Sequence, residues 1–443
     1  MNNNILSNEL DNLSNELIDF IYSSPTAFHA VANVKSKLDE NGFTELQLNK
    51  KWSVKEGGKY YVTKNLSAIV AFSINSENIE EEGFKIIGSH SDSPTFRIKP
   101  NAEMSVENSY LKLNTEGYGG MILSTWLDRP LSIAGRVVLS GGNTDDGILN
   151  PVEKIINFGR PMCIIPNVAI HLNRGVNDGY KFNKQVDMLP LVGILNDNLE
   201  KDNYLLKEIS KELDVDIEDI IDFDLFLYEF EKGCVMGANN EFISIGRQDN
   251  LSMAYTSIKS LIEARSGKGI NVVSIFDNEE VGSSTKQGAD SNMLLNILER
   301  ICISLGKDRE EFFEAIYSSY MISADLAHAV HPNMASKHDP TNRPVMGGGP
   351  AIKINANQAY TSDAYSTSVY KNICKNAGVK YQEFVNRSDE RGGSTIGPIS
   401  STHLDIPSVD VGCPILSMHS IRELGCMEDY IDIYKTFRSL YSL

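Results

Sequence analysis

The chain has 443 residues, of which 41% are hydrophobic, and a formal net charge of −18. This length suggests two or three domains with sizeable buried cores, and the hydrophobic residues are spread too evenly for a largely disordered protein. The acidic charge argues against a nucleic-acid partner, because no basic face for binding phosphates is evident. No stretch approaches 18 unbroken apolar residues, so we expect no membrane span or membrane partner.

Two features favour the cytoplasm. The first residues lack the basic and apolar regions of a secretory signal. The six cysteines lie far apart and form no Cys-x-x-Cys pair, which is typical of reduced thiols rather than of disulfides or a thiolate zinc site. We therefore predict a cytoplasmic protein.

The first ninety residues are predicted to form two helices and then three strands. Apolar residues recur at helical spacing within residues 8–22, and a second helix is expected to begin after Thr26 and to end at Asn41-Gly42. The strands are expected over residues 59–63, 67–74 and 84–87.

From about residue 100 to 240 the pattern changes to short strands broken by glycine and proline, with one helix near 200–213, as in a separate β-rich module. Beyond it, helices and strands alternate, which favours an α/β layer architecture with a largely buried sheet. The helices are expected over 251–265, 289–305, 361–377 and from 428. The strands are expected over 270–276, 319–323, 350–355, 380–385 and 408–411.

Carboxylates and histidines repeatedly follow short apolar strands. The five strand endings lead into His90 and Asp92, Asp249, Glu279 and Glu280, Asp325, and His419. Ligands of open α/β sheets gather beyond the carboxyl ends of the strands, so these side chains could converge on one crevice.

Histidine and carboxylate ligands without cysteine suit zinc, manganese or cobalt. Two histidines and three carboxylates are too many for one catalytic zinc, but they fit two metal ions that share a bridging carboxylate. The adjacent Glu279 and Glu280 could then divide their roles, one binding a metal and the other facing the metal-bound water.

Each residue also has a simpler explanation. His90 and Asp92 could form a local hydrogen-bonded pair, Asp249 could cap the helix 251–265, and adjacent glutamates are ordinarily solvated. These explanations weaken together, because all five loops follow apolar runs.

Six motifs resemble those of aspartyl aminopeptidases and vacuolar aminopeptidase I, a family of dinuclear zinc metallopeptidases. In family order they are Gly88–Pro94, Gly246–Asn250, Asp277–Ser283, Ser323–Asn333, Gly393–Pro398 and Met418–Glu423. The resemblance implies a mixed-sheet α/β/α metallopeptidase domain, formed by residues 1–97 and 240–443. It also implies an inserted β-rich dimerisation domain at 98–239, and a homo-oligomer in the form of a tetrahedral dodecamer.

The same resemblance implies two divalent metal ions per chain, zinc first, with manganese or cobalt as alternatives. His90 and Asp325 would bind one ion, Glu280 and His419 the other, and Asp249 would bridge them. Glu279 would be the general base, and Asp92 would orient the ring of His90.

The implied activity is the removal of N-terminal residues from short peptide substrates. Three further residues match family positions: His331 near the substrate carbonyl, His171 reaching a neighbouring subunit's site, and Lys353 associated with acidic side chains. A preference for N-terminal Asp or Glu over neutral residues stays open.

Two alternatives also stay open: a deacylase or carboxypeptidase with the same metal centre, and a non-catalytic assembly protein. Free-amine and N-acetylated peptides would separate the first from an aminopeptidase, and the intact Glu279 argues against the second.

Overall fold

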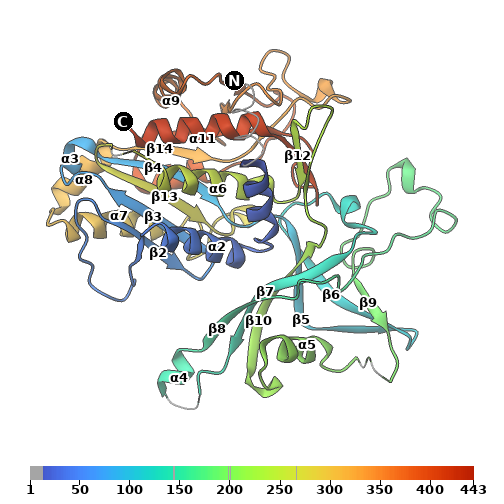
Figure 1. Cartoon of the computed structure of the whole chain (residues 1–443). Helices are drawn as coiled ribbons and strands as arrows, with labels where there is room; N and C mark the ends of the chain where they lie inside the picture. The colour runs from blue at the N-terminus through green and yellow to red at the C-terminus, as the bar shows by residue number, and fades with distance from the viewer. Residues whose placement is uncertain (1–12, 143–144, 198, 200, 266) are drawn as a thin grey trace. The chain divides into compact units, whose positions relative to one another are not determined.

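A computed structural model describes residues 13–142, 145–197, 199, 201–265 and 267–443 (Figure 1). These residues form two compact units. The first unit contains the chain up to Ser93, Gly233–Met418 and Glu423–Leu443, and the second contains Pro94–Lys232 and His419–Arg422. None of the helices in the described ranges combines the length and apolar character that crossing a lipid bilayer requires.

A nine-stranded mixed sheet forms the centre of the first unit. The four strands at its middle run parallel to one another, whereas several outer neighbours are antiparallel. This sheet confirms the predicted mixed α/β fold. In spatial order the strands are β1 (Thr44–Glu45), β2 (Lys59–Lys64), β3 (Ala68–Ile74), β13 (Ile270–Phe276), β4 (Phe84–His90), β14 (Tyr320–Ala324), β18 (Ser408–Gly412), β16 (Ala351–Lys353) and β17 (Gln382–Phe384).

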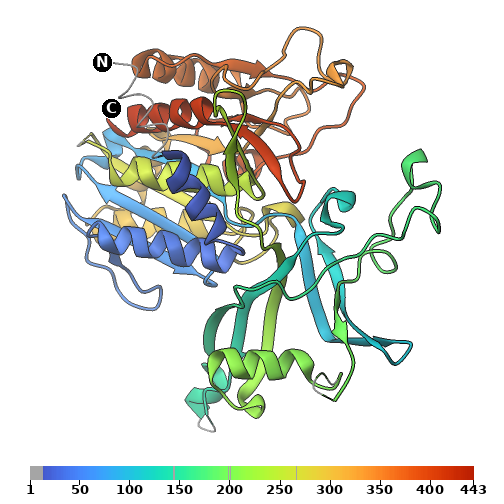
Figure 2. The ribbon, with the colours of Figure 1, turned by 45° about the vertical axis from the view of Figure 1, so that its right-hand side comes forward.

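The central strands are apolar on both faces, because each face is covered by helices. Along β13, Val273 and Ile275 enter one core, and Val272 and Phe276 enter the other, which follows the two-residue period of a strand. One layer of helices consists of residues 13–22, α2 (Ala27–Glu40), α6 (Gln248–Ile262), α9 (Ala364–Ala377) and α11 (Met427–Tyr441) (Figure 2). The other consists of α3 (Ile79–Glu82), α7 (Met293–Ser304), α8 (Arg309–Tyr317) and α10 (Ile396–Leu404).

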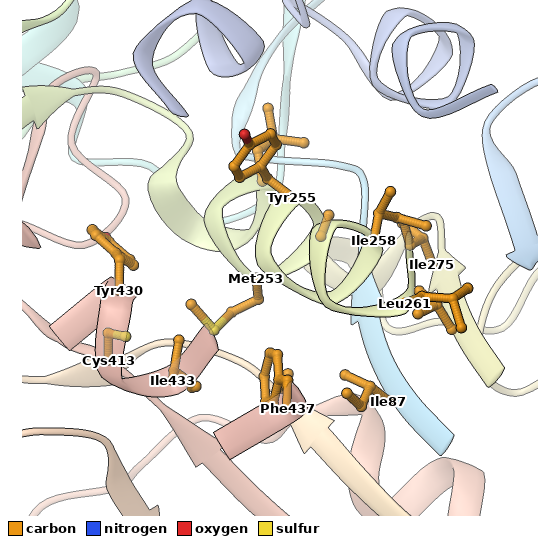
Figure 3. Close-up of a cluster of buried hydrophobic side chains, with 14 of the residues drawn as sticks. Ile87, Met253, Tyr255, Ile258, Leu261, Ile275, Cys413, Tyr430, Ile433 and Phe437 are labelled. Atoms are coloured by element: carbon orange, nitrogen blue, oxygen red, sulfur yellow. The ribbon is translucent and has the colours of Figure 1, made fainter. Parts of the chain in front are cut away.

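Figure 3 shows the first of these cores around α6. Met253 and Leu261 of α6 lie in the same cluster as Phe437 of α11 and Ile87 of β4, all of them buried. Asp249 and Asn250, at the start of α6, have non-helical backbone angles, so the regular helix begins near residue 251, as predicted.

Several elements differ from the sequence-based expectation. Residues 8–12 of the first predicted helix lie outside the described residues. Neither α8 nor α10 was predicted, and the strand expected before His419 is only the two-residue β19 (Pro414–Ile415). This strand pairs with β15 (Ala327–His328), and a further small sheet contains β11 (Cys234–Met236), β12 (Phe242–Ile245) and β20 (Glu423–Cys426).

The second unit contains a six-stranded antiparallel sheet. Its core includes Phe96, Trp126 and Leu225, and Ile209 of the predicted helix near 200–213 packs into it. In spatial order the strands are β8 (Val152–Asn157), β7 (Leu131–Leu139), β10 (Ile220–Glu229), β5 (Thr95–Val106), β6 (Tyr110–Tyr118) and β9 (Leu191–Ile194). Among the described residues of this unit, α4 (Asp145–Leu149) and α5 (Tyr204–Leu213) are α-helices.

Residues His419–Arg422 join the second unit although they come from the C-terminal part of the chain. Ile421 is buried in the core of this unit, and Arg422 forms an ion pair of 3.0 Å with the buried Glu229. The sequence did not predict this return of the chain. A role of the unit in pairing subunits stays a prediction.

Candidate metal centre

Parallel strands bring the candidate ligands of the first unit to one edge of its sheet. His90 is the last residue of β4 and is in register with Phe276, the last residue of β13. Asp325 directly follows Ala324, the last residue of β14. Because β13, β4 and β14 are parallel, their carboxyl ends share this edge, which is where α/β proteins bind ligands.

Three carboxylates surround one nitrogen of the buried His90 ring. His90 Nε2 lies 3.4 Å from Asp249 Oδ1, 4.0 Å from Glu279 Oε2 and 4.0 Å from Asp325 Oδ1. Ligand atoms that bind one ion at about 2.0–2.2 Å are roughly 3–4 Å apart, so these gaps fit a shared metal ion better than direct hydrogen bonds. Two groups of potential ligands result: His90, Asp249 and Asp325, and His90, Glu279 and Glu280.

The opposite nitrogen of the ring is held by Asp92. His90 Nδ1 lies 3.0 Å from the main-chain oxygen of Asp92 and 3.3 Å from its Oδ1. A carbonyl oxygen only accepts hydrogen bonds, so Nδ1 carries the proton and donates it. In the neutral form of the ring, the lone pair of Nε2 therefore faces the carboxylates, which is the arrangement of a histidine that binds a metal.

Asp92 also holds the turn that carries the two adjacent glutamates. Its Oδ1 accepts the main-chain N–H of Glu279 and its Oδ2 accepts that of Glu280, both at 3.1 Å. These residues begin the short 3-10 turn η4 (Glu279–Val281), which follows Asn278 with a left-handed φ of 62°. The sequence indicated the contact of Asp92 with His90 but gave no signal for the contact with this turn.

Asp249 is fixed through its backbone. Its N–H donates to Glu423 Oε2 at 3.1 Å, and its carbonyl oxygen accepts from Ser93 Oγ at 2.7 Å. The next residue, Asn250, donates from its side chain to the carbonyl oxygen of Ala324, one residue before Asp325. Buried Glu423 was not among the predicted site residues, because only its motif, and not this contact, is visible in the sequence.

Burial and crowding change the acidity of these groups. Burial, together with the nearby Asp325, Asp92 and Asp249, raises the pKa of Glu279 to about 8 against the opposing effect of His90. Burial also raises the pKa of Asp325, although Lys353 opposes it. For His90, burial favours the neutral ring, but the surrounding carboxylates outweigh this and raise its pKa well above the ordinary value.

Divalent cations fit this cluster on charge and on ligand chemistry. Four carboxylates face one histidine and one lysine, so the group carries an excess of negative charge that cations would neutralise. The donors are oxygen and imidazole nitrogen, which suit zinc, manganese and similar ions.

Lys353 is buried in the first unit. Its ammonium lies 2.9 Å from the carbonyl oxygen of Leu326 and 3.3 Å from Asp325 Oδ2. His331 lies in the same unit and lines a pocket of about 340 Å³. Its Nδ1 accepts the N–H of Asn333 at 3.2 Å, so its Nε2 carries the proton when the ring is neutral.

The other two predicted site residues belong to the second unit. His419 Nδ1 donates to the carbonyl oxygen of Gly120 at 2.8 Å, which leaves Nε2 as the nitrogen able to bind a metal. His171 is exposed in the irregular segment between β8 and β9.

Comparison with known proteins agrees with this chemistry. The family described as "Aminopeptidase I zinc metalloprotease (M18)" matches residues 20–441. A "Probable M18 family aminopeptidase 2" from Clostridium novyi is 60% identical, over 97% of this chain and 98% of the relative. The "Aspartyl aminopeptidase 4" of Saccharomyces cerevisiae is 39% identical, over 96% and 94%.

Solved structures are similar over almost the whole chain as well. The structure of the S. cerevisiae mApe1 dodecamer has a TM-score of 0.84 at 26% identity and covers 98% of both chains. The chain described here therefore belongs to the M18 family of metallopeptidases. It is a zinc aminopeptidase, a hydrolase that acts at the N-terminus of its substrates.

Proposed function

We propose that this aminopeptidase works with two divalent metal ions, zinc first, bound by residues from the ends of the parallel strands and by His419. His90 and Asp325 bind one ion, Glu280 and His419 bind the other, and Asp249 bridges them. The observation that carries the proposal is the ring of His90, whose Nδ1 is held by Asp92 while its Nε2 faces three carboxylate oxygens within 4.0 Å. Such ions supply Lewis acidity, which polarises a carbonyl and lowers the pKa of a water.

Glu279 is the general base in this proposal. Its carboxylate is largely buried beside the candidate ligands, with Oε2 4.0 Å from His90 Nε2, so it is placed to take a proton from a water at the centre and later to return it. It would accept the proton of the attacking water and pass it to the departing amine. His331, with a proton on Nε2, would donate to the substrate carbonyl.

The substrates are short peptides with a free N-terminal amine, as the membership of a family of aminopeptidases indicates. An acidic N-terminal residue would be favoured by the pocket beside His331, whose lining includes Lys337, Arg387 and Arg391 against the single acid Glu390. His171 would approach the site of a neighbouring subunit.

We also propose a homo-oligomer, with the second unit pairing subunits, and a tetrahedral dodecamer as its form. The similarity to the mApe1 dodecamer over 98% of the chain supports this proposal. The cytoplasmic location stays a prediction.

Glu279→Gln tests the proposed function. The amide cannot accept the proton, so turnover of free-amine peptides should fall at least 1,000-fold, at the upper range of general-base effects of about 10²–10⁴-fold. Metal content, measured by mass spectrometry, should remain near two ions per chain.

The exposed Glu310 on α8 offers a matched control, since Glu310→Gln removes the same charge at a site away from the centre. It should leave turnover unchanged. Full activity of Glu279→Gln would remove this residue from its role, and a metal content of one ion in the parent enzyme would contradict the two-metal arrangement.

A further inference from the structure

The segment His419–Arg422 begins with a residue in an unfavourable backbone conformation. His419 has a φ of 64°, in the left-handed region that residues with a Cβ rarely adopt. Two contacts with the loop that leads into the 3-10 turn η1 (Leu123–Trp126) hold it there. The main-chain N–H of Ile122 donates to the carbonyl oxygen of His419 at 3.0 Å, and Nδ1 of the ring donates to that of Gly120 at 2.8 Å. A candidate ligand in such a conformation needs support from the structure around it.

The other end of the segment is anchored by a buried carboxylate. Glu229, the last residue of β10, is 3% exposed. Arg422 approaches it with two nitrogens, Nη2 at 3.0 Å from Oε2 and Nε at 3.3 Å from Oε1. A two-point contact of this kind fixes the plane of the guanidinium as well as its position. The same guanidinium donates to the carbonyl oxygens of Glu231 at 3.2 Å and Lys232 at 3.4 Å, which ties Arg422 to the residues that follow β10.

Arg129 joins the same carboxylate to the turn η1. Its Nη1 pairs with Oε1 of Glu229, and its Nε donates to the carbonyl oxygen of Thr125 at 2.9 Å. The hydroxyl of Thr125 in turn accepts the main-chain N–H of Ile421 at 3.0 Å. Glu229 therefore supports the segment from both sides, directly at its last residue and through Arg129 and η1 on the side of His419.

We propose that Glu229 is a positioning residue for His419, which it serves by holding the segment in the conformation that leaves Nε2 of the ring oriented for metal binding. Glu229 acts through Arg422 and Arg129 and is not itself a ligand. Because two guanidinium groups share this carboxylate, its loss leaves two positive charges close together beside the segment, and their repulsion favours a displaced segment. This inference rests on the proposed role of His419 as a ligand of one metal ion.

The test is Glu229→Gln, which keeps the shape of the side chain and removes its charge. Competition of the metal-depleted protein with a chromophoric chelator for zinc should show one ion bound about 10–100-fold more weakly than in the parent enzyme, the usual effect of losing a partner of a metal ligand. The other ion should bind as in the parent. Parent affinity for both ions would overturn the proposal, and so would an equal loss at both ions, which a general loss of stability would produce.

Asp224 offers a matched control within the same strand β10. It also pairs with two arginines, Arg97 and Arg136, each at 2.6 Å, but these belong to β5 and β7 rather than to the segment of His419. Asp224→Asn should therefore leave the affinity for both zinc ions unchanged, even where the thermal midpoint of unfolding falls. A selective loss of one ion in this control would overturn the proposal, because any broken ion pair of the unit would then have the same effect.

His419→Ala separates this inference from the proposed function. If His419→Ala leaves the affinity for both zinc ions unchanged, the ligand role of His419 fails, whatever Glu229→Gln does. If His419→Ala weakens one ion while Glu229→Gln weakens neither, the ligand role stands and the positioning role of Glu229 fails.

A second variant covers the case in which Glu229→Gln does not fold. Arg422→Gln leaves Glu229 paired with Arg129, so the carboxylate keeps a positive partner and the variant should fold, as judged by circular dichroism. It removes the anchor at the end of the segment, so one zinc ion should again bind at least about 10-fold more weakly than in the parent. Parent affinity for both ions in folded Arg422→Gln would overturn the proposal.

Discussion

Asp92 connects two parts of the metal centre through one carboxylate. It fixes the ring of His90, and it accepts the N–H groups of Glu279 and Glu280, which lie 187 and 188 residues further along the chain. A change at this single position therefore disturbs a candidate ligand and the proposed base together, although Asp92 binds no metal in our proposal.

We expect Asp92→Asn to weaken zinc binding by about 10–100-fold while the protein stays folded. The amide has one acceptor oxygen in place of two, so one N–H of the turn faces the NH₂ group, and the ring of His90 keeps the main-chain oxygen of residue 92 but loses the nearby negative charge. Chelator competition measures the affinity. Asp290→Asn, which removes the negative charge beside His403 outside the centre, should bind zinc like the parent enzyme. Equal zinc affinity for Asp92→Asn and the parent would contradict this positioning role.

Among the elements, α2 contains a histidine whose protonation opposes folding. His29 lies in the first turn, where its Nδ1 is 2.8 Å from Thr26 Oγ1. Burial, and then the nearby Arg247, lowers the pKa of His29 to about 4 from an ordinary 6.5. Between these two values the unfolded chain binds a proton that the folded protein does not, so this histidine reduces stability as the pH falls from about 6.5 towards 4.

The variant His29→Gln isolates this effect. On going from pH 7.5 to 5.5, the parent should lose roughly 1 kcal/mol more free energy of unfolding than the variant, as expected for a group with this shift. Urea unfolding of both proteins at both pH values measures the difference. Comparing the two proteins cancels the contributions of other titrating groups. An identical pH dependence of the parent and the variant would show that His29 is protonated equally in the folded and the unfolded chain.

The elements also show how far the sequence predicts the fold. Strands β3 and β13 were predicted within one residue of their bounds, because strands covered on both faces are continuous apolar runs. Helix α8 was missed although Asp308 and Glu311 form a capping box, which is a readable signal. Helix α10 was missed because Gly397 and Pro398 suggest a break, whereas proline is tolerated in the first turn, where its missing N–H has no partner to lose.

The candidate site was predictable only in part, because short sequence patterns mark some of its residues and not others. Residues that follow apolar strands, such as His90 and Asp325, are marked by their position. Glu423 is not marked in this way, because its contact with Asp249 joins residues 174 positions apart. Supporting contacts of this kind depend on tertiary packing, which short sequence patterns do not contain.

At the scale of the whole molecule, the surface of the second unit bears on how copies of the chain assemble. It contains exposed apolar side chains, including Leu149, Leu172 and Val186, which are 80%, 83% and 70% exposed. Exposed apolar side chains in one unit of an acidic protein suit an interface between copies of the chain.

If the chain forms the proposed dodecamer, twelve copies of 49.1 kDa give a particle of about 590 kDa. Light scattering of the purified protein at micromolar concentration should report this mass.

Leu172→Asp places a charge on an exposed apolar position of the second unit. It should reduce the mass of the particle, because burying an unpaired charge at an interface is costly. Lys184→Asp, a charge change at an exposed polar position of the same unit, is the control and should keep the mass of the parent. A parent protein that is monomeric at this concentration would contradict the proposed assembly, and an unchanged mass for Leu172→Asp would place the interface elsewhere.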